Sequence, residues 1–123
     1  MHELIITEKP SAAKKTAYAL ADDKVTVRKF SQVSVYDIKH NKQSISIVSA
    51  VGHLFTVAEK KKSFKYPSFD IEWKPSASMN KNASYTKKYA DVIAKEAKKA
   101  NSFIVACDYD VEGEVIGLNV VRF

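Results

Sequence analysis

The sequence has 123 residues, of which 46% are hydrophobic and 28% are charged, and its formal net charge is +6. This is the length of about one small domain, and the composition excludes an intrinsically disordered chain. We find no apolar run long enough for a membrane span and no signal peptide, and a single cysteine excludes internal disulfides and cysteine-based zinc sites. A reducing, cytoplasmic setting is therefore expected.

The charge is distributed unevenly along the chain. Residues 101–123 contain four acidic residues and one basic residue, a net charge of −3, which leaves +9 for residues 1–100. A basic body beside an acidic cluster suggests a polyanionic partner that is held near a bound cation. The alternative is that the surface lysines only keep the protein soluble.

The first half of the sequence predicts a strand, a helix and a hairpin. Residues 4–7 form a short apolar, β-branched run that is typical of a strand. Pro10 suits the first turn of a helix, and the spacing of small apolar residues predicts that this helix covers roughly 10–21. Residues 33–38 and 45–51 then predict two strands, which form either a hairpin or an extension of the sheet.

Residues 58–82 show no clear periodicity, and we expect a long loop with short extended pieces. Lysines and aromatic residues alternate in it, a mixture that can hold a nucleic-acid backbone and stack on bases. The alternative, which we prefer for Phe69 and Trp73, is that these two rings fold back onto the core while the lysines face solvent.

The last part of the sequence predicts a helix over residues 83–100, a strand over 102–107 and a second helix from about Glu112. The run 102–107 is apolar throughout, which is typical of a central parallel strand buried on both faces. Alternating strands and helices predict an α/β fold with a mainly parallel sheet. Because the last helix reaches Phe123 without a stop signal, we expect the sequence to be part of a longer protein.

A cluster of acidic residues follows the apolar run. Asp108, Asp110 and Glu112 are spaced two apart, so in an extended segment their carboxylates would point the same way and repel one another. Mg²⁺ prefers such oxygen ligands, and Gly113 would allow a close turn of the backbone. The alternative, capping of a helix N-terminus, accounts for Glu112 and Glu114 but leaves Asp108 unexplained.

Two other strand ends carry candidate functional residues. Glu8 and Lys9 follow the first strand, and in α/β sheets sites lie beyond the carboxyl ends of the strands. If this strand neighbours 102–107, Glu8 becomes a candidate proton donor or acceptor and Lys9 can oppose phosphate charge. The alternative is a solvated loop pair. His53, after Gly52, is a candidate substrate contact, although a lone histidine is more often structural.

Three short motifs in this order resemble one protein family. Glu8-Lys9-Pro10-Ser11 follows the first strand, Gly52-His53-Leu54 lies in the middle, and an acidic stretch runs from Asp108 to Glu114. Together they resemble the Toprim domain of type IA DNA topoisomerases, particularly the topoisomerase III and archaeal topoisomerase I branches, over essentially the whole chain. The acidic motif alone is shared with primases and some nucleases, so the other two motifs make the resemblance specific.

The resemblance implies a Rossmann-like sheet of about four parallel strands flanked by helices, within a single domain over 1–123 that is one piece of a multidomain chain. It implies cleavage and rejoining of one DNA strand, with Mg²⁺, through a phosphotyrosine intermediate whose tyrosine lies in a later domain. The implied partners are the single-stranded DNA segment at the cleavage site and the remaining domains, and the implied location is the cytoplasm, in association with the nucleoid.

The resemblance also implies a role for each matching residue. Glu8 would be the general acid, and the base on rejoining, while Lys9 would stabilise the phosphoryl transition state. Asp108 and Asp110 would ligate Mg²⁺, with Glu112 as a further or water-mediated ligand.

One position departs from the family, and two other functions stay open. The family commonly has arginine where this sequence has Val111, so a role for that arginine has no counterpart here. A Toprim nuclease or primase-like enzyme would use the same acidic residues with metal-activated water. A non-catalytic binding or phosphoacceptor module could use an acidic pocket after a parallel strand.

Overall fold

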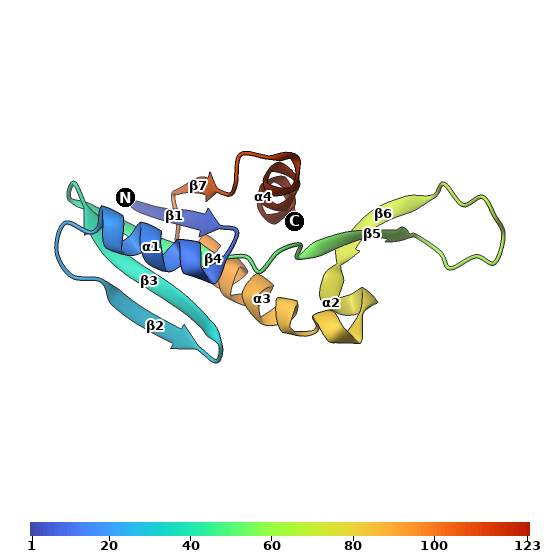
Figure 1. The fold of residues 1–123 in the computed structure, drawn as a ribbon, viewed down its shortest axis with the longest axis horizontal. Coiled ribbons are helices and arrows are strands. Elements are labelled where there is room, and N and C mark those ends of the chain that lie inside the picture. The colour runs from blue at the N-terminus through green and yellow to red at the C-terminus, as the bar shows by residue number, and fades with distance from the viewer.

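The computed structural model describes every residue from Met1 to Phe123, and Figure 1 shows its arrangement. Its centre is a five-stranded sheet with the order β2-β3-β4-β1-β7. The strands are β1 (His2–Thr7), β2 (Thr26–Phe30), β3 (Val33–His40), β4 (Gln43–Ser49) and β7 (Ser102–Ala106).

Most strands of this sheet run in one direction. β1 pairs in parallel with both β4 and β7, whereas β3 is antiparallel to both β2 and β4. Only β3 therefore opposes the other four strands, which confirms the predicted α/β class with a mainly parallel sheet. The predicted hairpin is confirmed as β3 and β4, and its second strand also extends the parallel part of the sheet.

Helices cover both faces of the sheet. On one face Ile5 of β1 packs with Ala13 and Ala17 of α1 (Pro10–Leu20), whose small side chains allow the helix to lie close to the strands. On the other face Leu4 and Ile6 belong to a larger cluster with residues of α3 (Tyr85–Ala97) and α4 (Val111–Arg122). Successive side chains of β1 thus point to opposite faces of the sheet, and both faces are buried.

A partly buried ion network joins β2 to α3. The guanidinium of Arg28 donates to both carboxylate oxygens of Glu96, at 3.0 and 2.9 Å, and also to the carboxylate of Asp37. The Glu96 side chain is fully buried and receives a further bond from Lys99 at 3.0 Å. Hydrogen bonds from Arg28 lower the pKa of Glu96 to about 2. The sequence pattern of residues 26–30 did not predict β2, because the partly buried central position of this strand is Arg28 instead of an apolar residue.

Residues 55–83 are more ordered than the sequence suggested. β5 (Phe55–Glu59) and β6 (Ile71–Pro75) pair as an antiparallel hairpin, and α2 (Ser76–Met79) and a 3₁₀ turn (Lys81–Ala83) lead into α3. Figure 1 shows this hairpin extending away from the sheet, with its loop at the far end. The expectation that Phe69 folds back onto the core is wrong, because this ring is 83% exposed. Trp73 is half-buried.

The expectation that residues 102–107 form a central, doubly buried strand is also wrong. β7 lies at the edge of the sheet and pairs only with β1. Phe103, Ile104 and Val105 are 48%, 42% and 42% exposed, because one edge and much of both faces of β7 have no neighbour. An apolar run predicts a strand, but it does not show which elements cover that strand.

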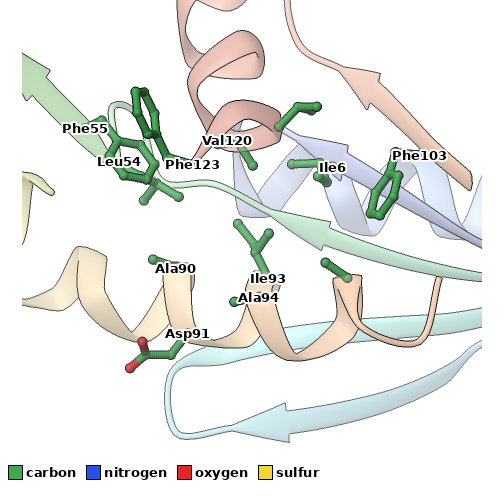
Figure 2. Close-up of a pocket in the computed structure, with 12 residues that line it drawn as sticks. Ile6, Leu54, Phe55, Ala90, Asp91, Ile93, Ala94, Phe103, Val120 and Phe123 are labelled. Atoms are coloured by element: carbon green, nitrogen blue, oxygen red, sulfur yellow. The ribbon is translucent and has the colours of Figure 1, made fainter. Parts of the chain in front are cut away.

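A separate apolar cavity of about 450 Å³ lies between α3 and α4 (Figure 2). Ile6, Leu54 and Phe55 line it together with Phe103 and Phe123. Its single charged lining residue, Asp91, points away from the cavity in Figure 2. No helix of this structure combines the length and the apolar character needed to span a bilayer.

Candidate functional site

The candidate site is formed where β1 and β7 end. These strands are parallel neighbours with Thr7 opposite Ala106, so the residues that follow each strand emerge at the same edge of the sheet. The backbone N–H of Asp108 donates to Oε2 of Glu8 at 3.3 Å. Lys9 Nζ lies 3.6 Å from Oε1 of Glu8 and 3.5 Å from Oδ2 of Asp108. The structure therefore brings Asp108 to the adjacent residues Glu8 and Lys9, about a hundred positions away in the sequence.

The turn after β1 is held by a buried threonine. The Thr7 hydroxyl is fully buried and lies 3.2 Å from the carbonyl oxygens of Lys9 and Val48, to which it can donate. The carbonyl of Thr7 accepts from the N–H of Ala50 at 2.8 Å, which joins the turn to the end of β4. Lys9 then occupies the N-cap position of α1 without a side-chain capping bond, and the first turn of this helix contains Pro10 as predicted. Thr7 was not a predicted site residue, and a polar residue ending a buried apolar run is the signal for it.

Burial differs sharply among the three residues. Glu8 is only 8% exposed, whereas the side chains of Lys9 and Asp108 are 61% and 63% exposed. The negative charges of Glu8 and Asp108 raise the pKa of Lys9 above its ordinary value, and the effect of Glu8 is the larger. Lys9 consequently stays cationic and balances two carboxylates, while its ammonium group remains accessible to an anion from solvent.

Cys107 lies beside this junction as a half-buried free thiol. Burial, followed by the charges of Glu8 and Asp108, raises the pKa of the Cys107 thiol. A neutral thiol is a poor nucleophile. These surroundings, and the packing of Cys107 against the main hydrophobic cluster, favour a structural role over a nucleophilic one.

The acidic motif bends instead of continuing as an extended segment. The N–H of Asp110 donates to the carbonyl of Asp108 at 2.9 Å, and Oδ1 of Asp110 accepts from the N–H of Gly113 at 2.7 Å. Asp110 is thus the N-cap of α4, and Glu112 lies in the first helical turn. The expected extended arrangement of the three carboxylates is wrong, because the helix begins one residue earlier than predicted.

Gly113 is needed where this bend brings the helix against the preceding strand end. A Cβ atom at position 113 would lie 2.1 Å from the carbonyl oxygen of Asp108, which is far inside van der Waals contact. The absence of a side chain at Gly113 therefore permits the close turn that the sequence suggested.

The middle motif reaches the acidic motif through His53. Its Nε2 lies 3.4 Å from Oε1 of Glu112, and the two side chains are 42% and 65% exposed. Gly52, with φ of +74°, adopts the left-handed conformation that favours glycine and turns the chain toward α4 after β4. The carboxylates of the acidic motif thus have three different partners: Lys9 for Asp108, the Gly113 amide for Asp110, and His53 for Glu112.

Part of the acidic motif surrounds a hollow that suits a hard cation. Asp108, Asp110 and Glu114 line a cavity of about 500 Å³ beside β7. No three His, Cys, Asp or Glu side chains are gathered closely enough to enclose a metal by themselves. Mg²⁺ usually keeps several waters and uses one or two carboxylates plus phosphate oxygens, so the donor chemistry of this open hollow fits that ion.

The sequence left Glu114 open between helix capping and metal binding, and the structure places it in the lining of this hollow, which Glu112 does not line. Asp110 and Glu114 are four residues apart, and this spacing places them on the same side of a helix that begins at residue 111. The position of Glu114 relative to Asp110 depends on the first residue of α4, which the sequence pattern placed one residue too late.

Comparison with known proteins gives a consistent family. The Toprim domain model matches residues 3–123. DNA topoisomerase 1 of Pyrococcus horikoshii is 42% identical over 120 residues, which cover 98% of this chain and 18% of that protein. DNA topoisomerase 1 of Methanocaldococcus jannaschii is 44% identical over 125 residues, covering 100% of this chain and 16% of that protein.

DNA topoisomerase 3 of Dictyostelium discoideum is a more distant relative, 31% identical over 127 residues, which cover 97% of this chain and 15% of that protein. The chain spans less than a fifth of the length of each of these three relatives. The family model and the relatives agree across nearly the whole sequence, and the chain belongs to the Toprim domain family.

Proposed function

We propose that this chain is the Toprim part of a type IA DNA topoisomerase, where it supplies proton-transferring and charge-neutralising groups for the cleavage and rejoining of one DNA strand. The observation that carries the proposal is the junction of Glu8, Lys9 and Asp108 within 3.6 Å of one another at the carboxyl ends of two parallel strands. The names of the relatives, DNA topoisomerase 1 and 3, support the same reaction.

Glu8 would act as the general acid on cleavage and as the base on rejoining. Its carboxylate is held in place by the Asp108 amide and is nearly excluded from water, which fixes one oxygen and leaves the other beside Lys9. A positioned proton donor of this kind typically contributes a factor of about 10² to 10⁴ to a reaction rate.

Lys9 would neutralise charge on the phosphoryl group. Phosphoryl transfer depends mainly on positioning and on electrostatic stabilisation, and an exposed ammonium group fixed between two carboxylates provides both. Its accessible side chain can approach a phosphate without rearrangement of the backbone.

Asp108 and Asp110 would hold Mg²⁺, with Glu112 as a further or water-mediated ligand and Glu114 close by in the same hollow. When bound, the ion would neutralise phosphate oxygens next to Lys9. The contribution of the chain itself is to fix Asp108 beside Lys9 and Asp110 at the start of α4.

Single-stranded DNA at the cleavage site and further domains of a longer polypeptide would complete the enzyme. The nucleophilic tyrosine would lie in one of those domains, and we assign that role to none of the tyrosines in this sequence. Action on chromosomal DNA would place the protein at the nucleoid.

The proposal is tested in the full-length protein that contains this sequence. Wild-type protein should relax supercoiled plasmid and form a covalent protein–DNA adduct with a single-stranded oligonucleotide. Lys9→Gln should slow adduct formation by about a hundredfold, because removal of a preorganised charge-stabilising donor costs on that order. Lys14→Gln, which changes an exposed lysine on α1, should behave as wild type.

Two results would contradict the proposal. Free DNA ends produced without a covalent adduct would indicate a nuclease. Equal rates of adduct formation for Lys9→Gln and Lys14→Gln would remove the Lys9 role.

A further inference from the structure

The loop between β5 and β6 combines positive charge with exposed aromatic rings. Residues 60–69 contain four lysines, at positions 60, 61, 62 and 65, and no acidic residue. Phe64, Tyr66 and Phe69 are 101%, 90% and 83% exposed. Figure 1 shows that this loop lies at the end of the hairpin, away from the sheet.

The base of the loop is fixed by specific contacts. The N–H of Lys60 donates to the carbonyl of Asp70 at 3.0 Å, and their side chains form an ion pair at 3.4 Å. Lys74 Nζ donates to the carbonyl of Glu59 at 2.9 Å from the facing strand. The loop therefore starts and ends at a defined place, and its cations and rings are presented together.

Charge alone does not explain the composition of this loop. Lysines on a surface are common and increase solubility, but three fully or largely exposed aromatic rings leave apolar area in water without any benefit to folding. Lys60 is already paired with Asp70, which leaves Lys61, Lys62 and Lys65 to bind an external anion. The rings require a partner with flat apolar faces, and the lysines require a polyanion.

We infer that loop 60–70 is a contact site for single-stranded nucleic acid, in which Lys61, Lys62 and Lys65 bind phosphates and the three rings stack on unpaired bases. Aromatic side chains beside a cationic surface are the combination by which proteins bind single strands with little sequence preference. A duplex fits less well, because its base faces are already stacked on one another. The inference rests on the proposed function in taking DNA as the partner, but it involves none of the residues of the Glu8 junction.

The test measures binding of the 123-residue chain to a fluorescent oligo(dT) of about 15 nucleotides, by anisotropy, with a chelator present so that no cation site contributes. The triple variant Phe64→Ala, Tyr66→Ala, Phe69→Ala should weaken binding about tenfold or more, with an unchanged salt dependence. The triple variant Lys61→Gln, Lys62→Gln, Lys65→Gln should lower the slope of log K against log salt by about 2, at roughly 0.7 per phosphate contact.

Two matched controls separate this site from general charge. Lys14→Gln, Lys15→Gln, Lys24→Gln removes three exposed lysines elsewhere, and Tyr18→Ala removes a ring that is 59% exposed on α1. Both should bind within about twofold of wild type. All variants should have the circular dichroism spectrum of wild type, because none of the substituted side chains belongs to the core.

Several outcomes would overturn the inference. These are wild-type affinity of the aromatic variant, an equal loss in both triple-lysine variants, or no binding to the oligonucleotide. Loop-dependent binding to anionic phospholipid vesicles but not to DNA would indicate a membrane contact. If loop variants bind DNA normally while Lys9→Gln abolishes adduct formation, only the loop inference fails. If the loop variants bind DNA more weakly while Lys9→Gln forms the adduct at the wild-type rate, the loop inference stands and the proposed function fails.

Discussion

Nε2 of His53 lies 3.4 Å from Oε1 of Glu112, so the segment after β4 meets the first turn of α4. This contact links two of the three sequence motifs, and hydrogen bonding of Glu8 to the Asp108 amide links the first motif to the third. The motifs are therefore parts of one site.

His53→Gln should change the free energy of unfolding by less than about 1 kcal/mol. Both side chains of the pair are substantially exposed, and exposed ion pairs contribute little to stability. Urea denaturation of the 123-residue chain measures this change. A loss well above about 1 kcal/mol would show that His53 is a structural residue instead of a candidate substrate contact.

Gly113→Ala should destabilise the chain by about 2 kcal/mol or more, because the added Cβ meets the carbonyl oxygen of Asp108, a backbone atom that cannot move without disturbing β7. Gly117→Ala is the matched control on the same helix. Its added Cβ meets a side-chain methyl group of the exposed Val105, which can rotate away, so the loss should be smaller. Thermal unfolding of both variants provides the comparison, and equal losses would contradict the close turn at Gly113.

Glu96 should make the free energy of unfolding depend on pH between about 4.5 and 2. Arg28 lowers the pKa of this buried carboxyl from 4.5 to about 2, so the stabilisation is fully present above pH 4.5 and is lost as the pH falls toward about 2. A lowering of this size corresponds to about 3 kcal/mol. The difference in unfolding free energy between wild type and Glu96→Gln should therefore shrink across this range. A difference that stays constant would contradict the role of the ion network.

Mg²⁺ should bind the isolated chain weakly, because few protein ligands besides exposed carboxylates are available and phosphate is absent. Calorimetric titration should show smaller heats for Asp108→Asn and Asp110→Asn than for wild type. Glu72→Gln, which changes an acidic residue on β6, should not reduce them. Identical heats in wild type and both aspartate variants would remove the metal assignment.

The sequence predicted the elements that surround the site because their patterns are strong. Pro10 and the spacing of Ala13 and Ala17 defined α1, and β-branched runs defined β1 and β4. The sequence did not predict β5 and β6, because neither strand has a buried face of apolar residues that would mark it.

The sequence indicated which candidate residues could lie together, but it did not indicate their individual contacts. We expected Glu8 to face Asp108 only if their strands were neighbours, and the parallel pairing of β1 with β7 meets that condition. The capping bond of Asp110 to Gly113 and the pairing of Glu112 with His53 depend on where α4 begins and how the chain turns after Gly52. Those details are set by tertiary packing, which a single sequence pattern does not contain.

In the proposed function, Glu8 would transfer a proton during cleavage of the DNA strand. The most direct test of this role is the single-turnover rate of covalent adduct formation by the full-length protein with Glu8→Gln, compared with Glu3→Gln at the other end of β1. We predict a loss of about a hundredfold or more for Glu8→Gln with DNA affinity retained, and a wild-type rate for Glu3→Gln. Equal rates in the two variants would contradict the account.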